Sequence, residues 1–448
     1  MKHVPLLKME TNTVTKLVLI AKKAKEDKRA KFTRLMYLLQ EDYLYECFTM
    51  LGKRKAAGVD GRTLESYSDE EVKQAIADTV MQLKARKFKP QPVRRVSIEK
   101  GNGKMRPLGI PTVMDKLVQL AMTRILSAIY EQDFLPVSYG YRVGKDAHEA
   151  LKEINHMIMG QKLNYIIDAD IEGFFDQLNH KWLMKCLSER ISDPHFKRLI
   201  WKFLTSGAME EGKYFSTKEG SPQGGIISPI LANIYLHYVL DLWFEKKLKQ
   251  SLKGYSKLVR YADDFLIGLQ YQREAAQLLE QITERLQKFG LTLSKEKTAI
   301  KEFGRFAAEN RQRRGQKKPE TFNFLGFTHY CSKTQDGRFQ VRVKTQGKRL
   351  NKVVVEMNTY LKRVRSSLPV KEIWKTVSAK LTGHYNYYGV SGNFETIQRY
   401  YLKTINQTFR WLNKRSEKKS FSWERFQKYL VMYPLPEPKL TYTLYNTW

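Results

Sequence analysis

Two adjacent aspartates, Asp263 and Asp264, stand between two short apolar runs within residues 258–268. The runs predict two strands bounded by glycines, with Tyr-Ala-Asp-Asp at the turn of a hairpin. Two carboxylates this close repel each other and are costly to bury. A divalent cation relieves the repulsion, and oxygen ligands suit Mg²⁺. The same dipeptide is common in solvated surface turns, so a metal site needs support from elsewhere in the chain.

That support comes from a second acidic cluster in residues 165–176, which begins as an apolar strand. Asp168 and Asp170 are two positions apart, so a strand would place their side chains on one face. Phe174 and Phe175 follow, where a bound sugar could pack on an aromatic ring. The ordinary alternative is an acidic strand end that begins a helix.

If the strand end and the hairpin turn lie on adjacent strands, their carboxylates converge on a two-metal site. One Mg²⁺ ion would lower the pKa of an attacking 3′-hydroxyl, and the other would hold a triphosphate and the leaving oxygen. Such phosphoryl transfer depends mainly on positioning and electrostatics. The expected metal ligands are Asp170, Asp263 and Asp264, with the backbone carbonyl of Ile171 as a weaker candidate. Asp168 is expected to be structural.

Residues 93–111 alternate apolar and polar around a Gly-Asn-Gly turn, which predicts a hairpin. Lys100 and Arg106 lie near its tip, where Arg could bind phosphate through two hydrogen bonds and Lys as a point charge. A triphosphate clamp is one interpretation, and a surface hairpin with incidental basic residues is the other. Gln223 lies in a Gly/Pro-rich turn that opens a helix, where it could touch a base or a sugar.

The composition points to a polyanionic partner. The chain has 448 residues, with 79 Lys+Arg against 46 Asp+Glu and a net charge of +33. Such an excess is most simply explained by nucleic acid, and the many aromatic residues could stack unpaired bases. The widely spaced Cys47, Cys186 and Cys331 predict neither a disulfide framework nor a zinc site. The cysteine usage fits a cytoplasmic location, and because no long apolar run occurs we expect no membrane partner.

The elements around the candidate site follow from periodicity and punctuation. A helix is expected at 63–87, a strand at 290–298 and a polar loop dense in Arg and Lys at 310–318. Residues 345–430 are expected to form several basic helices with regularly placed aromatics. The change in composition predicts a domain boundary near residue 335.

Several sequence blocks, in a fixed order, resemble the reverse transcriptases encoded by bacterial group II introns. The blocks are Ala57-Gly58-Val59-Asp60-Gly61, Arg106-Pro107-Leu108-Gly109-Ile110-Pro111, Ser138-Tyr139-Gly140-Tyr141-Arg142, Asp170 through Asp176, Ser221-Pro222-Gln223-Gly224-Gly225, Tyr261-Ala262-Asp263-Asp264, and Phe324-Leu325-Gly326-Phe327. The resemblance implies an α+β fold of the right-hand polymerase type, with fingers, a palm of antiparallel sheet and helices, and an α-helical thumb.

The resemblance also implies how the chain is divided. Residues 1–110 would hold the N-terminal extension and fingers, and 111–335 the palm with the remaining fingers elements. Residues 336–448 would form the thumb, or maturase domain, and an extended tail. The reverse transcriptase domain would span about 50–330.

The roles of individual residues follow from the same resemblance. Asp170, Asp263 and Asp264 match the catalytic positions that bind two Mg²⁺ ions. The positions that match dNTP-binding residues are Lys100, Arg106, Phe174, Phe175 and Gln223. Of these, Phe174 corresponds to the aromatic ring that excludes a ribose 2′-hydroxyl, and Phe175 is a close competitor for this role. Candidates for nucleic-acid contact are Arg142, Lys295, Lys297, Trp374, Tyr388 and Trp411.

The expected function is RNA-directed DNA synthesis from a primer 3′-hydroxyl, with intron RNA binding, splicing and a role in retrohoming. The partners would be an RNA template, intron RNA, a DNA primer or target, and dNTPs. No Cys/His cluster serves an HNH endonuclease, so the chain resembles the short, endonuclease-lacking class. An alternative function is that of a free-standing enzyme in DNA repair or phage defence. A homodimer is an alternative to a monomer. A non-catalytic splicing cofactor would be expected to have lost one of the three aspartates, and all are present.

Overall fold

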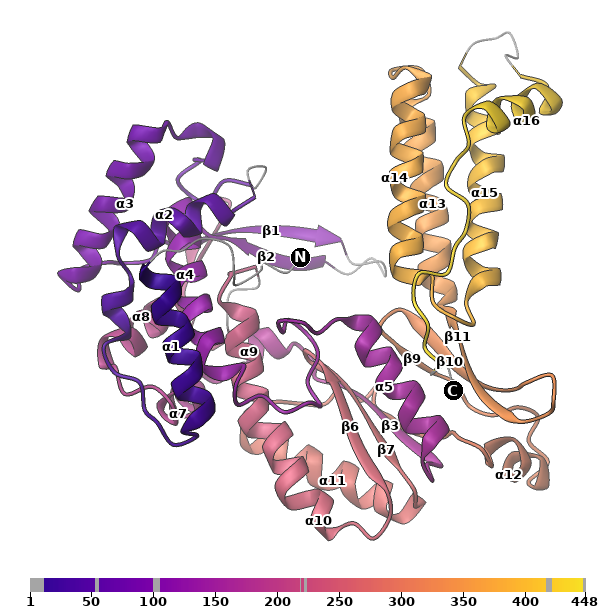
Figure 1. The fold of residues 1–448 in the computed structure, drawn as a ribbon, viewed down its shortest axis with the longest axis horizontal. Helices are drawn as coiled ribbons and strands as arrows, with labels where there is room; N and C mark the ends of the chain where they lie inside the picture. Colours follow the sequence, from indigo (N-terminus) through magenta and orange to yellow (C-terminus); the bar gives the residue numbers. More distant parts are fainter. Residues whose placement is uncertain are drawn as a thin grey trace.

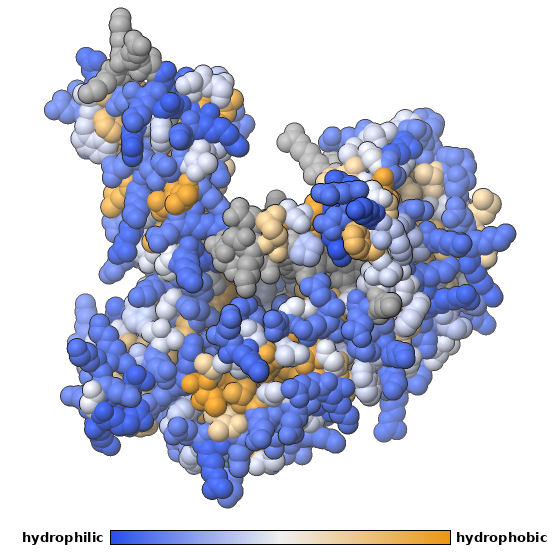
Figure 2. Space-filling model, turned by 180° about the vertical axis from the view of Figure 1, so that it is seen from behind, coloured by the Kyte–Doolittle hydropathy of each residue, from blue (hydrophilic) through white to orange (hydrophobic). Residues whose placement is uncertain are grey.

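The computed structural model describes residues 12–52, 56–99, 105–217, 219–220, 224–415 and 421–445 of the chain. Figure 1 shows an N-terminal group of helices beside a small sheet, a central sheet with its helices, and a tall set of C-terminal helices. Polar side chains cover most of the face drawn in Figure 2, in keeping with the net charge of +33. The mixed helix and sheet content confirms the α+β class.

The central sheet has the strand order β6-β7-β3-β8, and all its neighbours are antiparallel. Its strands are β3 (Tyr165–Asp170), β6 (Ser256–Tyr261), β7 (Asp264–Leu269) and β8 (Ala299–Glu302). β6 and β7 form the hairpin that the apolar runs predict, and β3 pairs with the other side of β7. The aspartate-bearing ends of β3 and β7 therefore lie side by side.

The strand expected at residues 290–298 is wrong in position. Leu293 makes an isolated bridge to Ile171, but the paired strand β8 begins later, at Ala299. The backbone N–H of Thr298 donates to the carbonyl of Ser294 at 2.9 Å, which bends this stretch into a turn instead of an extended strand.

Helices cover both faces of the central sheet because its strands are apolar on both sides. Ile166 and Leu266 pack in one core cluster with α5 (Ala147–Gly160), while Ile167 and Ile267 pack in another with α11 (Gln272–Lys288). The buried residues of α11 recur at helical spacing: Ala275, Leu278, Ile282 and Leu286. α9 (Ser228–Leu236) shares the α11 core and continues as the π-helical turns η3 (His237–Asp241) and η4 (Phe244–Leu248), then α10 (Lys249–Ser251).

The N-terminal part combines helices with a sheet of order β2-β1-β4-β5. Its strands are β1 (Val93–Glu99), β2 (Met105–Ile110), β4 (Ala208–Glu210) and β5 (Lys213–Phe215). Its helices are α1 (Asn12–Glu26), η1 (Leu35–Leu38), α2 (Glu41–Met50), η2 (Leu64–Ser66), α3 (Asp69–Lys84), α4 (Val113–Tyr130), α6 (Phe174–Gln177), α7 (His180–Ser188) and α8 (Pro194–Leu204). The predicted pairing of β1 with β2 is confirmed, and the tip of this hairpin lies outside the described residues.

The helix expected at 63–87 begins later than its apolar periodicity suggests. Ser68 caps α3: its hydroxyl accepts from the backbone N–H of Glu71, whose carboxylate accepts from the backbone N–H of Ser68. Such a reciprocal cap fixes a helix start. The residues before it form the separate short turn η2.

The C-terminal part begins with a sheet of order β11-β10-β9, made of β9 (Phe322–Phe324), β10 (Phe327–Lys333) and β11 (Phe339–Thr345). The helices expected in 345–430 follow: α13 (Gly347–Val364), α14 (Val370–Tyr388), α15 (Phe394–Leu412) and α16 (Trp423–Met432). The boundary predicted near residue 335 falls in the turn of the β10–β11 hairpin. The loop expected at 310–318 is partly wrong, because α12 (Ala307–Arg313) extends into it, supported by the Glu309–Arg313 ion pair one helical turn apart.

All three cysteines are free thiols. Burial raises the pKa of Cys47 to about 11 and that of Cys186 to about 12, so both thiols stay protonated near neutral pH. Across the described ranges, no helix is both long enough and apolar enough to cross a membrane.

Candidate active site

The three aspartates predicted as metal ligands gather where β3 and the β6–β7 hairpin end. Asp170 and Asp264 are direct partners in the register of β3 with β7, and their side chains are hydrogen-bonded. Asp263 precedes Asp264 in the two-residue turn after Tyr261 and adds to its electrostatic environment. Residues far apart in the sequence are thus joined through strand pairing.

Negative charge is in excess in this cluster. Burial, the hydrogen bond to Asp170 and the negative charge of Asp263 together raise the pKa of Asp264 to about 8. Lys297, carried by the turn before β8, offsets part of the negative charge. Its Nζ lies 2.7 Å from Oδ2 of Asp170, and this hydrogen bond raises the pKa of Lys297. A carboxyl group that resists ionisation beside other carboxylates is a place where a cation binds favourably.

The donor set therefore fits a divalent metal ion, although it is not a finished cage. Among the described residues, no three His, Cys, Asp or Glu side chains already stand in metal-binding array. Oxygen ligands with this many negative charges favour Mg²⁺. The side chain of Ile171, directly after β3, is buried, so only its backbone could serve as a ligand.

Asp168, which is expected from the sequence to be structural, forms an ion pair with the neighbouring strand. Its Oδ2 lies 3.0 Å from Nζ of Lys301 on the neighbouring strand β8. Burial raises the pKa of Asp168, and Lys301 opposes this shift. The ion pair ties β3 to β8 beneath the aspartate cluster.

A cavity of about 870 Å³ opens over the cluster. The sheet supplies its floor, and the opposite wall comes from the C-terminal part, including Lys348 and Arg349 of α13 and Tyr387 and Tyr388 of α14. This volume lies in the range of ligand pockets. Aromatic rings, cations and carboxylates thus line one cavity.

A buried network that sequence reasoning missed holds the turn of the hairpin. Arg260 is fully buried, and its guanidinium meets both carboxylate oxygens of Asp241, at 2.7 and 2.5 Å. The same group donates to Asn233 Oδ1 at 3.1 Å and to the carbonyl of Ala262 at 2.9 Å. The signal in the sequence was an arginine between the apolar residues of β6, a position that burial normally denies to a charge.

The turn itself is strained. Ala262 has a φ of 57°, in the left-handed region, which costs an L-residue about 1–2 kcal/mol. Gly140 packs so closely that a Cβ there would lie 2.5 Å from the backbone nitrogen of Ala262. Tyr141 and Leu325, which also line the cavity, are left-handed too. Such strain persists where the surroundings enforce it, and it concentrates at functional sites.

The two candidate rings for sugar contact differ in exposure. Phe174 is 2% exposed and packs in the core beside Phe175, at a centroid distance of 5.4 Å, and Tyr235. Phe175 is only half-buried. Phe175 is therefore the ring that has exposed surface for contact with a sugar.

The candidate triphosphate contacts lie mostly beyond what the structure describes. Lys100 and Gln223 are outside the described residues, and of Arg106 only the backbone, in β2, is described.

Three of the residues predicted to contact nucleic acid are instead buried. Arg142 lies in the protein interior, where it pairs with Glu131 at 3.0 Å and donates to two backbone carbonyls. Trp374 and Trp411 are core residues of the C-terminal helices, and each indole N–H is bonded within the protein, to Tyr433 O and Asn358 Oδ1. The prediction was wrong for these three because charge and aromaticity do not reveal burial.

The other predicted contacts stay accessible. Tyr388 lines the cavity, Lys295 is exposed, and Lys297 is exposed but bound to Asp170.

Comparison with known proteins gives one consistent family. The family model described as "Reverse transcriptase (RNA-dependent DNA polymerase)" matches residues 98–329. The group II intron-encoded protein LtrA of Lactococcus lactis subsp. cremoris is 31% identical over 457 residues, which cover 86% of this chain and 75% of that protein. Protein YkfC of Escherichia coli is 32% identical over 289 residues, covering 56% of this chain and 75% of that protein.

A third relative comes from a eukaryote: an uncharacterized 91 kDa protein in the cob intron of Schizosaccharomyces pombe, 35% identical over 250 residues that cover 54% of this chain and 30% of that protein. The matched region contains the aspartate cluster, the strained turn and the cavity floor. The chain therefore belongs to the reverse transcriptase family, within the group that includes group II intron-encoded proteins.

Proposed function

We propose that this protein copies RNA into DNA by adding dNTPs to a primer 3′-hydroxyl at the Asp170–Asp263–Asp264 cluster. In this proposal the central sheet is the palm, the N-terminal part holds the fingers, and α13–α15 form the thumb. The N-terminal extension and fingers would occupy residues 1–110, the palm with the remaining fingers elements 111–335, and the thumb with the tail 336–448. One observation carries the proposal: Asp170 and Asp264 are hydrogen-bonded across paired strands, on the floor of a cavity whose opposite wall is basic and aromatic.

The residues divide the chemical work among them. Asp170, Asp263 and Asp264, with the carbonyl of Ile171, would hold two Mg²⁺ ions. When bound, these ions supply a lowered pKa for the 3′-hydroxyl and stabilise charge on the triphosphate. Lys297 orients Asp170 through its 2.7 Å contact and offsets part of the repulsion among the carboxylates before the ions bind.

The walls of the cavity would position the substrates. Lys348 and Arg349 face the floor with positive charge suited to a phosphate backbone, and Tyr388 offers an aromatic surface. Lys100, Arg106 and Gln223 are assigned to the incoming dNTP from their sequence positions.

Primer extension on an RNA template tests the proposal. Wild-type protein with Mg²⁺ is expected to extend a DNA primer, and Asp263→Ala is expected to lose extension while it still binds the RNA. RNA binding measured on the same preparation is the control for folding. Full extension by Asp263→Ala would show that the metal site is assigned wrongly.

Sugar selection gives a second expectation. Phe175→Ala should raise the use of ribonucleotides relative to deoxyribonucleotides by about tenfold or more, because the half-buried ring would no longer exclude a 2′-hydroxyl. Phe174→Ala should instead lower the free energy of unfolding by about 3–5 kcal/mol, as expected for a buried ring in the core. Single-nucleotide incorporation kinetics and thermal unfolding separate the two. Relaxed selection in Phe174→Ala alone would return the role to that ring.

We further propose that the protein binds an intron RNA, assists its splicing and takes part in retrohoming. The net charge of +33 and the names of intron-encoded relatives support this. A catalytic intron RNA in the flanking DNA would favour this role over a free-standing enzyme of repair or defence. The three retained aspartates argue against a purely non-catalytic splicing cofactor.

A further inference from the structure

A second cavity, of about 320 Å³, lies in the N-terminal part of the molecule. Three segments line it: residues 33–40 around η1, residues 83–86 at the end of α3, and residues 192–195 at the start of α8. Figure 1 shows α3 and α8 at the opposite end of the molecule from α13 and α14, which contribute to the lining of the catalytic cavity. The second cavity is therefore a separate feature.

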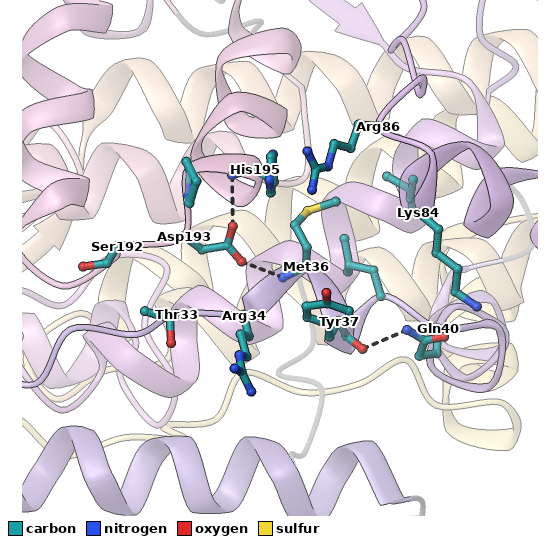
Figure 3. A pocket seen from close by; sticks show the side chains of 13 residues that line it. Thr33, Arg34, Met36, Tyr37, Gln40, Lys84, Arg86, Ser192, Asp193 and His195 are labelled. Carbon is teal, nitrogen blue, oxygen red and sulfur yellow. Dashed lines mark hydrogen bonds between the residues drawn. The ribbon is translucent and has the colours of Figure 1, made fainter.

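Its lining combines an apolar floor with free cations. Leu39 and Leu83 are buried and Met36 is half-buried. Around this floor stand the exposed cations of Arg34, Lys84 and Arg86, with Arg34 and Arg86 on different sides of the hollow in Figure 3. Within the described part of the chain, none of these three side chains forms a hydrogen bond or ion pair.

The one acidic residue in the lining already accepts hydrogen bonds from within the protein. Asp193 Oδ1 accepts from the backbone N–H groups of His195 and Phe196, and its Oδ2 accepts from the backbone N–H of Met36, each at 3.0 Å. Figure 3 shows the hydrogen bonds that this carboxylate accepts from His195 and Met36. Tyr37, at the rim, is 73% exposed. The cavity thus offers cations, an aromatic ring and an apolar floor to a ligand.

The backbone is left-handed at two of these cations. Arg34 and Arg86 have φ values of 58° and 61°, in the left-handed region where glycine is normally found. Among the described residues, the other non-glycine residues with positive φ are Tyr141, Ala262 and Leu325, which line the catalytic cavity, and Glu211 in the β4–β5 turn. Arg86 follows the C-cap of α3, where a left-handed residue commonly ends a helix, whereas Arg34 precedes η1 without a side-chain cap. Left-handed non-glycine residues also gather at ligand sites.

We propose that this cavity binds an unpaired nucleotide of single-stranded RNA. The base would rest against Met36 and Leu83 beside the ring of Tyr37, and the flanking phosphates would meet Arg34 and Arg86. An inorganic anion would leave the apolar floor unused, and a duplex keeps its bases stacked and paired, so neither matches the lining as well. The proposal rests on the proposed function, since it takes RNA as the partner, and it adds a contact outside the catalytic cavity.

The test uses substitutions that relieve strain as they remove charge. Arg34→Gly/Arg86→Gly deletes both cations, and glycine adopts positive φ freely, so thermal stability should not fall. Glu211→Gly is the matched control, because it relaxes the same backbone conformation away from the cavity. Fluorescence anisotropy would follow a short, labelled, unstructured RNA binding to protein whose catalytic cavity is saturated with unlabelled primer–template.

We expect the double variant to bind this RNA at least about tenfold more weakly, and the slope of log affinity against log salt to shrink by about 1.4 for two lost phosphate contacts. Tyr37→Ala should also weaken binding, and Glu211→Gly should not. Primer extension at saturating primer–template should persist in all variants, which separates this site from the proposed polymerase function. Unchanged RNA affinity in the double variant, or an equal loss in Glu211→Gly, would overturn the proposal.

Discussion

Asp264→Asn is expected to end primer extension and, at the same time, to stabilise the metal-free protein. Metal-ion stabilisation of transition-state charge is worth several kcal/mol, so its loss should slow extension by about 1,000-fold or more. The gain in stability follows from the site itself, where burial and two neighbouring carboxylates disfavour the ionised form of Asp264. An amide of the same shape carries no charge to desolvate.

The pH dependence of this gain has a definite sign. The pKa of Asp264 is raised from its ordinary value of 3.8 to about 8 in the folded protein, so between these pH values the folded state binds more protons than the unfolded state. The contribution of Asp264 to stability must therefore fall as pH rises from about 4 to 8. The difference in melting temperature between variant and wild type should widen over this range when a chelator is present, and narrow when Mg²⁺ is added.

Thermal unfolding at several pH values, beside primer extension, measures both effects. Loss of extension together with a lower melting temperature would mean that the substitution damages the fold, and the site would then need another explanation. The charge of Lys297 opposes the rise in the pKa of Asp264, although the direct contact of Lys297 is with Asp170.

Arg260→Met is expected to be among the most destabilising single substitutions in the protein. It leaves Asp241 buried without its partner, and breaking a buried pair in this way costs about 3–5 kcal/mol. Replacing both partners, in Arg260→Met/Asp241→Leu, removes the stranded charge, so most of the lost stability should return. Urea unfolding of the wild type, the single variant and the double variant measures this.

Activity should not return with stability. In the double variant, the carbonyl of Ala262 still lacks its donor, so the strained turn that carries Asp263 is no longer held in place. Misplacement of catalytic groups by about 1 Å can cost about 100-fold in rate. We expect primer extension to stay reduced by that order, with a higher Mg²⁺ concentration needed for half-maximal rate. A stable double variant with wild-type extension and metal dependence would show that the network serves the fold alone.

Asp264 could be identified from the sequence, whereas the role of Arg260 could not. Asp264 was identified because adjacent acidic residues between apolar runs form a local pattern, and strand periodicity gave the hairpin. Arg260 stands four residues away and was missed, because its partners Asp241 and Asn233 come from η3 and α9. Residues that meet only in the folded protein have no fixed spacing in the sequence from which the contact could be predicted.

Burial separates the predicted residues in the same way. Phe174 and Phe175 are neighbours of one type, yet one packs in the core and the other keeps exposed surface. Trp374 and Trp411 suggested stacking partners for bases, but the C-terminal helices enclose them. Side-chain chemistry can be read along the chain, whereas exposure depends on which other surface covers it.

The amino-acid sequence by itself determined the α+β class, the order of the sequence blocks, the aspartates at the site and the basic character that calls for nucleic acid. These properties reside in residue type and short-range periodicity, which are local. The tertiary structure decided that Lys297 binds Asp170, that Arg260 holds the hairpin turn, and that Arg34 and Arg86 border one cavity. Each of these depends on segments that are apart in the chain, since Arg260 is itself anchored by Asp241, and such segments meet only when the chain packs its apolar faces together.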